Sequence, residues 1–197
     1  GNITHPAKVK GPINTIFSIL NLLVIKTEFM KKGLFHIWCE KSKQMDKYKP
    51  DFTLTDILKT LPQYTTTPTG EKRAILKIRT EDHAILKGRY QKIFEEEWAK
   101  KKDELKSKFG IVRYRSFSNN GTKQSEGLKD FSVSGKGGLK IQFYNLKDEP
   151  VGFIWMRGSG TEPIFRIMAD IKGLSLEDEK YLVEWQGEMV RRADLGT

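Results

Sequence analysis

The residues with the clearest chemical potential lie in one short stretch, Arg-Gly-Ser-Gly-Thr-Glu-Pro at 157–163. Arg157 carries a planar guanidinium whose paired N–H groups match two oxygens of a phosphate. Ser159 and Thr161 add short hydroxyl donors, and the glycines between them let the backbone bend and approach a ligand closely. Successive backbone N–H groups in such a turn form a concave anion site. The stretch is a candidate phosphate-binding loop, and the alternative is a plain glycine-rich turn.

Glu162 stands out in this loop because a carboxylate facing a phosphate would repel it. We expect its side chain to turn away from the ligand and to support the loop by bonding to backbone or to a neighbouring arginine. Each charge-assisted hydrogen bond to a phosphate contributes about 1.5–3 kcal/mol, and association costs remove part of that gain. The loop is therefore suited to be one wall of a site whose other walls come from elsewhere.

The elements around the loop predict an α+β unit, an antiparallel sheet packed with helices. An apolar strand delivers the chain to Arg157, and a second strand leaves the loop after Pro163. A long amphipathic helix precedes them and ends at a glycine. The expected elements are a strand at 73–79, a helix at 85–109, strands at 111–117, 139–144, 151–156 and 163–171, and a last helix begun by the capping pair Ser175 and Asp178.

The part of the chain before this unit has a different character. Pro12 opens an apolar helix pattern, and Thr53 with Asp56 forms a capping box for a short helix that Pro62 stops. The run Thr-Thr-Thr-Pro-Thr-Gly at 65–70 has the composition of a linker. We therefore expect two domains, 1–67 and 68–197.

Composition narrows the function classes. The chain has 197 residues, a formal net charge of +10 and 38% hydrophobic residues, which is typical of a core-forming protein. Its single cysteine, Cys39, excludes a disulfide framework and a cysteine-based zinc site, and three scattered histidines predict no metal site. His83, near a helix start, is expected at the surface. The apolar run at 13–25 is too short to span a bilayer, so we expect a cytoplasmic protein without a membrane partner.

Arg157 to Pro163, followed by Arg166 in Ile-Phe-Arg-Ile, resembles the phosphate-binding loop in the C-terminal domain of the α-D-phosphohexomutases, the phosphoglucomutase and phosphomannomutase superfamily. Gly158 stands where relatives often carry proline or alanine. The similarity is dense over residues 139–172 and loose over the rest. It identifies 1–67 as a helical remnant of the family's third, α/β domain, and 68–197 as its fourth, with a fold like that of the TATA-box-binding protein.

The resemblance also implies a function. A full-length phosphohexomutase is an isomerase that transfers a phosphoryl group within a hexose phosphate, using a phosphoserine and a magnesium ion in its first two domains. The fourth domain holds the substrate's non-reacting phosphate. By position, Arg157, Ser159, Gly160 and Thr161 would contact that phosphate, with Gly158, Glu162 and Arg166 in support. The resemblance leaves open whether Arg166 lies on the loop side of its strand or at a domain interface.

The motifs that carry phosphoryl transfer in the family are missing from this sequence: the Ser-His phosphoserine loop, the Asp-rich magnesium loop and the Gly-Glu-x-Ser-Gly sugar loop. We therefore expect a C-terminal fragment with no catalytic residue, no metal and no cofactor of its own, inactive alone. Its partners would be a glucose or mannose phosphate and the missing N-terminal domains of the same chain, not nucleic acid.

Two other functions stay open at this point. One is a stand-alone sugar-phosphate sensor that uses the same loop. The other is a basic nucleic-acid-binding module, because Arg113, Arg115 and Phe117 interleave cations with aromatic rings. The glycine-rich segment at 134–138 lacks the spacing of a nucleotide-binding P-loop and is expected to be a flexible connection before a strand.

Overall fold

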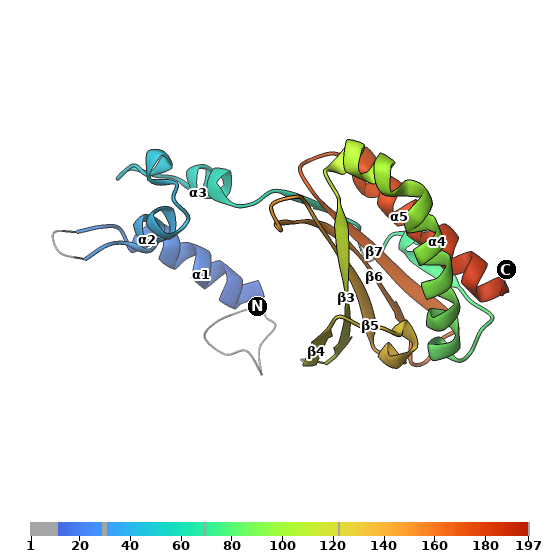
Figure 1. The fold of residues 1–197 in the computed structure, drawn as a ribbon. Coiled ribbons are helices and arrows are strands. Elements are labelled where there is room, and N and C mark those ends of the chain that lie inside the picture. The colour runs from blue at the N-terminus through green and yellow to red at the C-terminus, as the bar shows by residue number, and fades with distance from the viewer. Residues whose placement is uncertain (1–11, 29–30, 69, 122, 197) are drawn as a thin grey trace. The chain divides into compact units, whose positions relative to one another are not determined.

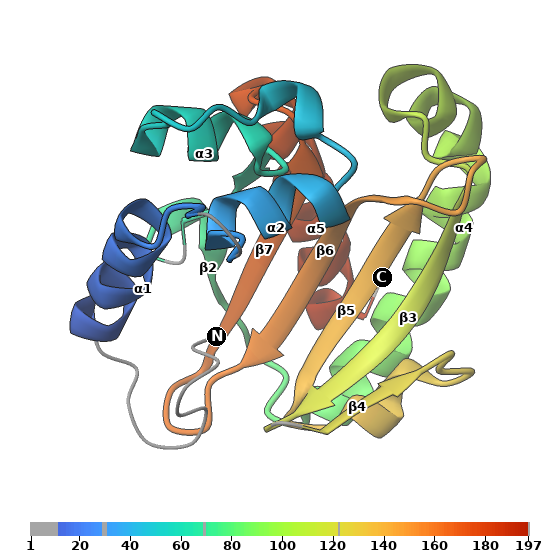
Figure 2. The same cartoon turned by 90° about the vertical axis from the view of Figure 1, so that its left-hand side faces the viewer.

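Two structural units follow one another along the chain, 1–62 and 63–197. The computed structural model describes residues 12–28, 31–68, 70–121 and 123–196, drawn in Figures 1 and 2. The first unit is helical, and the second contains all of the described sheet.

The first unit contains α1 (Pro12–Val24), α2 (Leu34–Lys41), the short 3₁₀ helix η1 (Met45–Lys47) and α3 (Leu54–Thr60). Its small core is built from Phe35, Cys39, Phe52 and Ile57. The predicted capping box is confirmed: the Thr53 amide donates to Asp56 Oδ2 over 2.8 Å at the start of α3. Hydrogen bonds to that carboxylate, from the Thr53 backbone first and then its hydroxyl, lower the pKa of Asp56 to about 2.

The second unit is an antiparallel sheet of seven strands with the order β1-β7-β6-β5-β3-β4, in which β2 also pairs with β7. The central strands are β5, β6 and β7, and the loop of interest joins β6 to β7. The strands are β1 (Tyr64–Thr66), β2 (Ile75–Lys77), β3 (Arg113–Asn120), β4 (Lys123–Glu126), β5 (Gly138–Tyr144), β6 (Pro150–Gly158) and β7 (Ile164–Lys172).

Helices α4 (His83–Phe109) and α5 (Leu176–Leu195) cover one face of this sheet, which Figure 1 shows from the side and Figure 2 from the front. The Asp82 carboxylate caps α4 by accepting from the Ala84 and Ile85 amides, and Ser175 Oγ caps α5 by accepting from Asp178 N–H. Gly110, at a φ of 69°, ends α4 in the left-handed conformation that glycine favours. Two 3₁₀ turns complete the unit, η2 (Lys72–Ala74) and η3 (Phe131–Ser134).

Strand alternation divides the sheet into a buried and an open face. In β7 the residues Phe165, Ile167, Ala169 and Ile171 are buried, whereas those between them are less buried or exposed. The helices supply the other half of this core, including Leu86, Phe94, Leu182 and Met189. The predicted α+β class, an antiparallel sheet packed with helices, is confirmed.

The boundary between the units differs from the predicted linker. The division falls between Pro62 and Gln63, not after Thr67. Tyr64 to Thr66 forms β1 on the edge of β7, and Thr67 N–H donates to the Ala169 carbonyl. A threonine-rich segment reads as a linker by composition, but its β-branched residues also suit an edge strand.

Candidate functional site

The loop from residue 159 to 163 is folded by its own hydrogen bonds. The Ser159 amide donates to the Ile164 carbonyl over 2.9 Å, which closes the turn between β6 and β7. Ser159 Oγ accepts from the amides of Thr161 and Glu162, each at 3.3 Å, and lies 3.5 Å from Thr161 Oγ1. The two predicted hydroxyls are therefore side by side on a preformed turn. Among the described residues, nothing accepts a hydrogen bond from the exposed Gly160 amide, so a ligand can use it.

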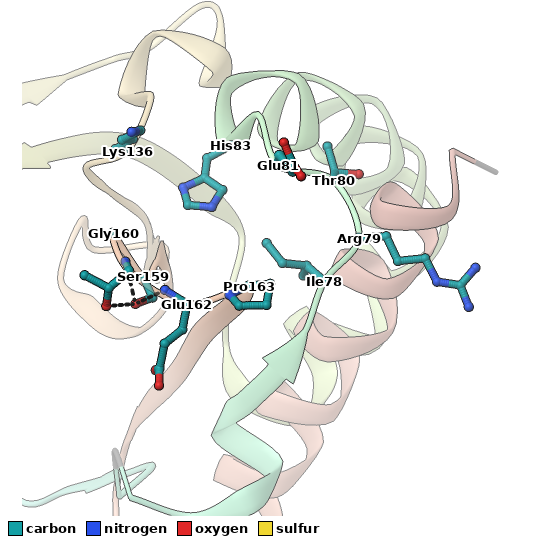
Figure 3. Close-up of a pocket in the computed structure, with 11 residues that line it drawn as sticks. Ile78, Arg79, Thr80, Glu81, His83, Lys136, Ser159, Gly160, Glu162 and Pro163 are labelled. Carbon is teal, nitrogen blue, oxygen red and sulfur yellow. Dashed lines mark hydrogen bonds between the residues drawn. The ribbon is translucent and has the colours of Figure 1, made fainter.

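This loop forms one wall of a cavity of about 340 Å³. The imidazole of His83 projects into the space, and Lys136 lies across from the connection between β2 and α4 (Figure 3). The Arg79 side chain points away, and the Glu162 carboxylate also points away from the imidazole (Figure 3). The lining residues are Ile78, Arg79, Thr80, Glu81, His83, Lys136, Ser159, Gly160, Thr161, Glu162 and Pro163.

The two arginines of the predicted site lie on the open face of the sheet, at the ends of the strands that carry the loop. Arg157 in β6 is the direct cross-strand partner of Arg166 in β7, and both are exposed. This places Arg166 on the same face as Arg157, a point that the sequence left open. The Arg157 guanidinium forms no ion pair with any residue that the structure describes.

Gly158 follows Arg157 in β6, so a side chain at position 158 would lie on the opposite face of the sheet. On that face Gly158 is buried against His83. A Cβ atom at position 158 would lie 2.0 Å from His83 Cε1 and 2.2 Å from Nδ1. The imidazole also meets the Phe165 ring edge to face, with centroids 5.5 Å apart. Only 7% of His83 is exposed. The prediction of a surface histidine is therefore wrong: packing of the helix start against β6 and β7 buries the ring.

Lys136 contributes a further wall of the cavity, and the segment at 135–137 around it is fixed by a buried lysine. Lys87 Nζ donates to the carbonyls of Gly135 and Gly137 over 2.8 and 2.6 Å. Burial lowers the pKa of Lys87 to about 8, and the positive charge of Arg157 adds to that shift. The expected connection before β5 is thus anchored to α4, and Lys136 lines the cavity.

The connection that leads into α4 is held by the last turn of α5. The Asp194 carboxylate accepts from the amides of Arg79 and Thr80 over 2.9 and 2.8 Å. Burial works against the ionised form, but these hydrogen bonds outweigh it and lower the pKa of Asp194. The wall of the cavity opposite the loop is therefore attached to the core helices.

Sequence reasoning found the loop but missed His83, Lys87 and Lys136. His83 directly follows the capping residue Asp82, a position that the sequence does mark as a helix start. The glycines around Lys136 signal a tight turn. Neither signal shows that these segments meet at the β6–β7 loop, because that depends on how α4 packs on the sheet.

The described residues contain no group of three histidine, cysteine or acidic side chains that could hold a metal ion. No helix in the described part of the chain has the length and apolar character needed to cross a bilayer. No protein-family model matches the chain, and no curated protein matches it significantly.

Proposed function

We propose that the second unit clamps the phosphate of a hexose phosphate, as the fourth domain of a phosphohexomutase does. The observation that carries this proposal is the preformed β6–β7 turn, whose exposed Gly160 amide and neighbouring Ser159 and Thr161 hydroxyls follow directly after the Arg157 guanidinium at the end of β6. A fixed positive charge beside a group of neutral donors favours an oxyanion as the ligand.

The donors at the loop suit a phosphate. Arg157 would supply a charged, two-pronged donor from the strand end, while Ser159 Oγ–H, Thr161 Oγ–H and the exposed Gly160 amide would supply neutral donors from the turn. Ser159 already accepts two backbone hydrogen bonds, so its own proton is the group left for a ligand. Gly160 has open space around its Cα, so a ligand can approach the backbone there.

By this proposal the chain is part of a cytoplasmic isomerase, with glucose or mannose phosphate as substrate. The residues of this chain would bind and orient, and phosphoryl transfer with its magnesium ion would belong to other domains. The chain alone would therefore bind hexose phosphate weakly and catalyse no isomerisation.

Backbone amide chemical shifts, followed while inorganic phosphate or glucose 1-phosphate is added to the full chain, test this proposal. Amides 157–161 should respond first, and Arg157→Ala should strongly weaken the response. Arg115→Ala is the matched control, because Arg115 lies on the same face but pairs with Glu126 at 2.9 Å. An Arg157→Ala variant that titrates like the wild type would overturn the assignment of the clamp.

Nucleic-acid binding by the basic sheet face is the competing function. The arginines of β3 are already engaged: Arg113 and Arg115 lie 4.6 and 5.1 Å from the ring centroid of Tyr144. Lys140 likewise lies 4.5 Å from the Phe153 ring centroid. Rings covered by the protein's own cations are poor stacking platforms for bases. Salt-dependent, sub-micromolar retention of single-stranded RNA without any phosphate response would favour this alternative instead.

A further inference from the structure

His83 is a buried titratable group beside the cavity, and the proposed phosphate clamp does not use it. Its Nδ1 is buried and has no hydrogen-bond partner among the residues that the structure describes. An unsatisfied buried nitrogen destabilises a folded protein. The ring nevertheless lies directly against the backbone of Gly158 and lines the same cavity as Ser159, Gly160 and Thr161.

The position of His83 in its helix favours an anion nearby. It is the first residue of α4, a helix of 27 residues. The amino end of such a helix carries a partial positive charge that attracts anions and disfavours a protonated imidazole. Asp82 already caps two of the helix amides, so an anion in the cavity would meet the imidazole rather than a free helix end.

Burial and the charges around the ring favour its neutral form. Burial lowers the pKa of His83 most, and the positive charges of Lys87 and Lys136 lower it further, while Asp82 opposes them. The other charged groups at this cavity come from the connection before α4 and from the loop, namely Arg79, Glu81 and Glu162. An oxyanion bound in the cavity would place up to two negative charges near the ring and shift the protonation equilibrium of His83 toward the imidazolium form.

We propose that His83 takes up a proton when an oxyanion binds at the 159–161 loop, so that the affinity of the site rises as the pH falls. This inference rests on the proposed function, because it needs an anion at the loop. The protonated ring carries a positive charge and a hydrogen on each nitrogen, so it attracts an anion in the cavity. The fixed charge of Arg157 then supplies binding at every pH, and His83 adds a component that depends on pH.

Gly158 makes this arrangement possible. Any side chain at position 158 would occupy the space of the imidazole, since even a Cβ atom would lie 2.0 Å from Cε1. Glycine at position 158 is therefore what allows the His83 ring to lie against the loop.

Sulfate is the suitable probe, because it stays a dianion over the whole working range and contributes no titration of its own. Binding of sulfate to the full chain is measured by calorimetry from pH 5.5 to 7.0, in two buffers that differ in protonation enthalpy. Lys87, with a pKa of about 8, stays protonated in that range. We expect net proton uptake when sulfate binds and an affinity that falls as the pH rises, by at most tenfold for each pH unit.

His83→Gln should remove the proton uptake and flatten the pH dependence, whereas His36→Gln, in the first unit, should change neither. The His83 Cε1–H signal of the wild type gives a second readout that needs no variant: its titration midpoint should move upward when sulfate is saturating. A sulfate response at amides 157–161 with no proton uptake and an unmoved His83 midpoint would overturn the inference and leave the phosphate clamp standing. Absence of any sulfate or phosphate response would overturn both.

Discussion

The contact between Gly158 and His83 predicts a strong energetic coupling between the two positions. Gly158→Ala places a methyl group 2.0 Å from Cε1 and 2.2 Å from Nδ1 of the imidazole, so the ring must move. Overpacking of this kind costs about 2 kcal/mol, and the smaller entropy of the unfolded alanine chain returns about 0.5 kcal/mol. The variant should therefore be less stable than the wild type by about 1.5 kcal/mol.

The sign should reverse when the ring is absent. In a His83→Ala background the new methyl group occupies the space of the missing imidazole, so the overpacking cost disappears. Only the smaller conformational entropy of the unfolded alanine chain then affects stability. Gly158→Ala should then stabilise the protein by about 0.5 kcal/mol, which gives a coupling energy of about 2 kcal/mol between the two sites. The coupling is read from urea unfolding of the four proteins of the cycle, followed by tryptophan fluorescence.

Gly160→Ala is the matched control within the same loop. A Cβ atom at that position meets nothing within 4 Å, so the substitution should leave stability unchanged or slightly raised. Equal destabilisation by Gly158→Ala with and without the His83 ring would refute the reasoning, because it would trace the cost to the backbone rather than to the imidazole.

Two further predictions concern buried charges. Between about pH 8 and 10.5 the unfolded chain binds more protons at Lys87 than the folded chain does. The free energy of unfolding should therefore rise with pH by about 3 kcal/mol over that window, and Lys87 should cause no change below it. Lys87→Met should flatten this rise in urea unfolding at pH 8, 9 and 10; an unchanged slope would show that other groups cause it. Glu179 is 1% exposed and accepts hydrogen bonds from Thr67 and Arg73. Glu179→Ala should cost about 3 kcal/mol and lower the melting temperature more than Glu188→Ala, an exposed control on the same helix; equal losses would contradict a buried ion pair.

The sequence predicted best those elements whose cause is local. The capping box at Thr53, the cap at Ser175 and the glycine after α4 each depend on residues within one turn, and the structure has all three. The strands on either side of the loop could also be predicted from nearby residues, because apolar residues precede the loop in β6 and follow it in β7. Local hydrogen-bond geometry is nearly independent of the rest of the fold, and this is why such elements can be read from sequence.

The parts that the sequence missed depend on contacts between distant segments. β1 exists because Thr67 and its neighbours pair with β7 about a hundred residues later. The burial of His83 likewise requires β6 and β7 to pack under the start of α4. A histidine beside a helix cap is most often solvated, and no pattern along the chain distinguishes the case in which a strand covers it.

Strand alternation gives the two sides of the loop different chemistry. Arg157 and Gly158 are adjacent in β6, so the two positions face opposite sides of the sheet. The Arg157 guanidinium lies on the open face, and on the other face the His83 ring fills the space that a side chain at position 158 would need. A guanidinium stays charged at every working pH, whereas an imidazole does not. Arg157→Ala should therefore lower sulfate affinity by a similar factor at pH 5.5 and pH 7.0, while His83→Gln should lower it mainly at pH 5.5. If the two variants have parallel pH profiles, then Arg157 and His83 do not contribute to anion binding in different ways, and the assignment of a constant contribution to Arg157 and a pH-dependent one to His83 is wrong.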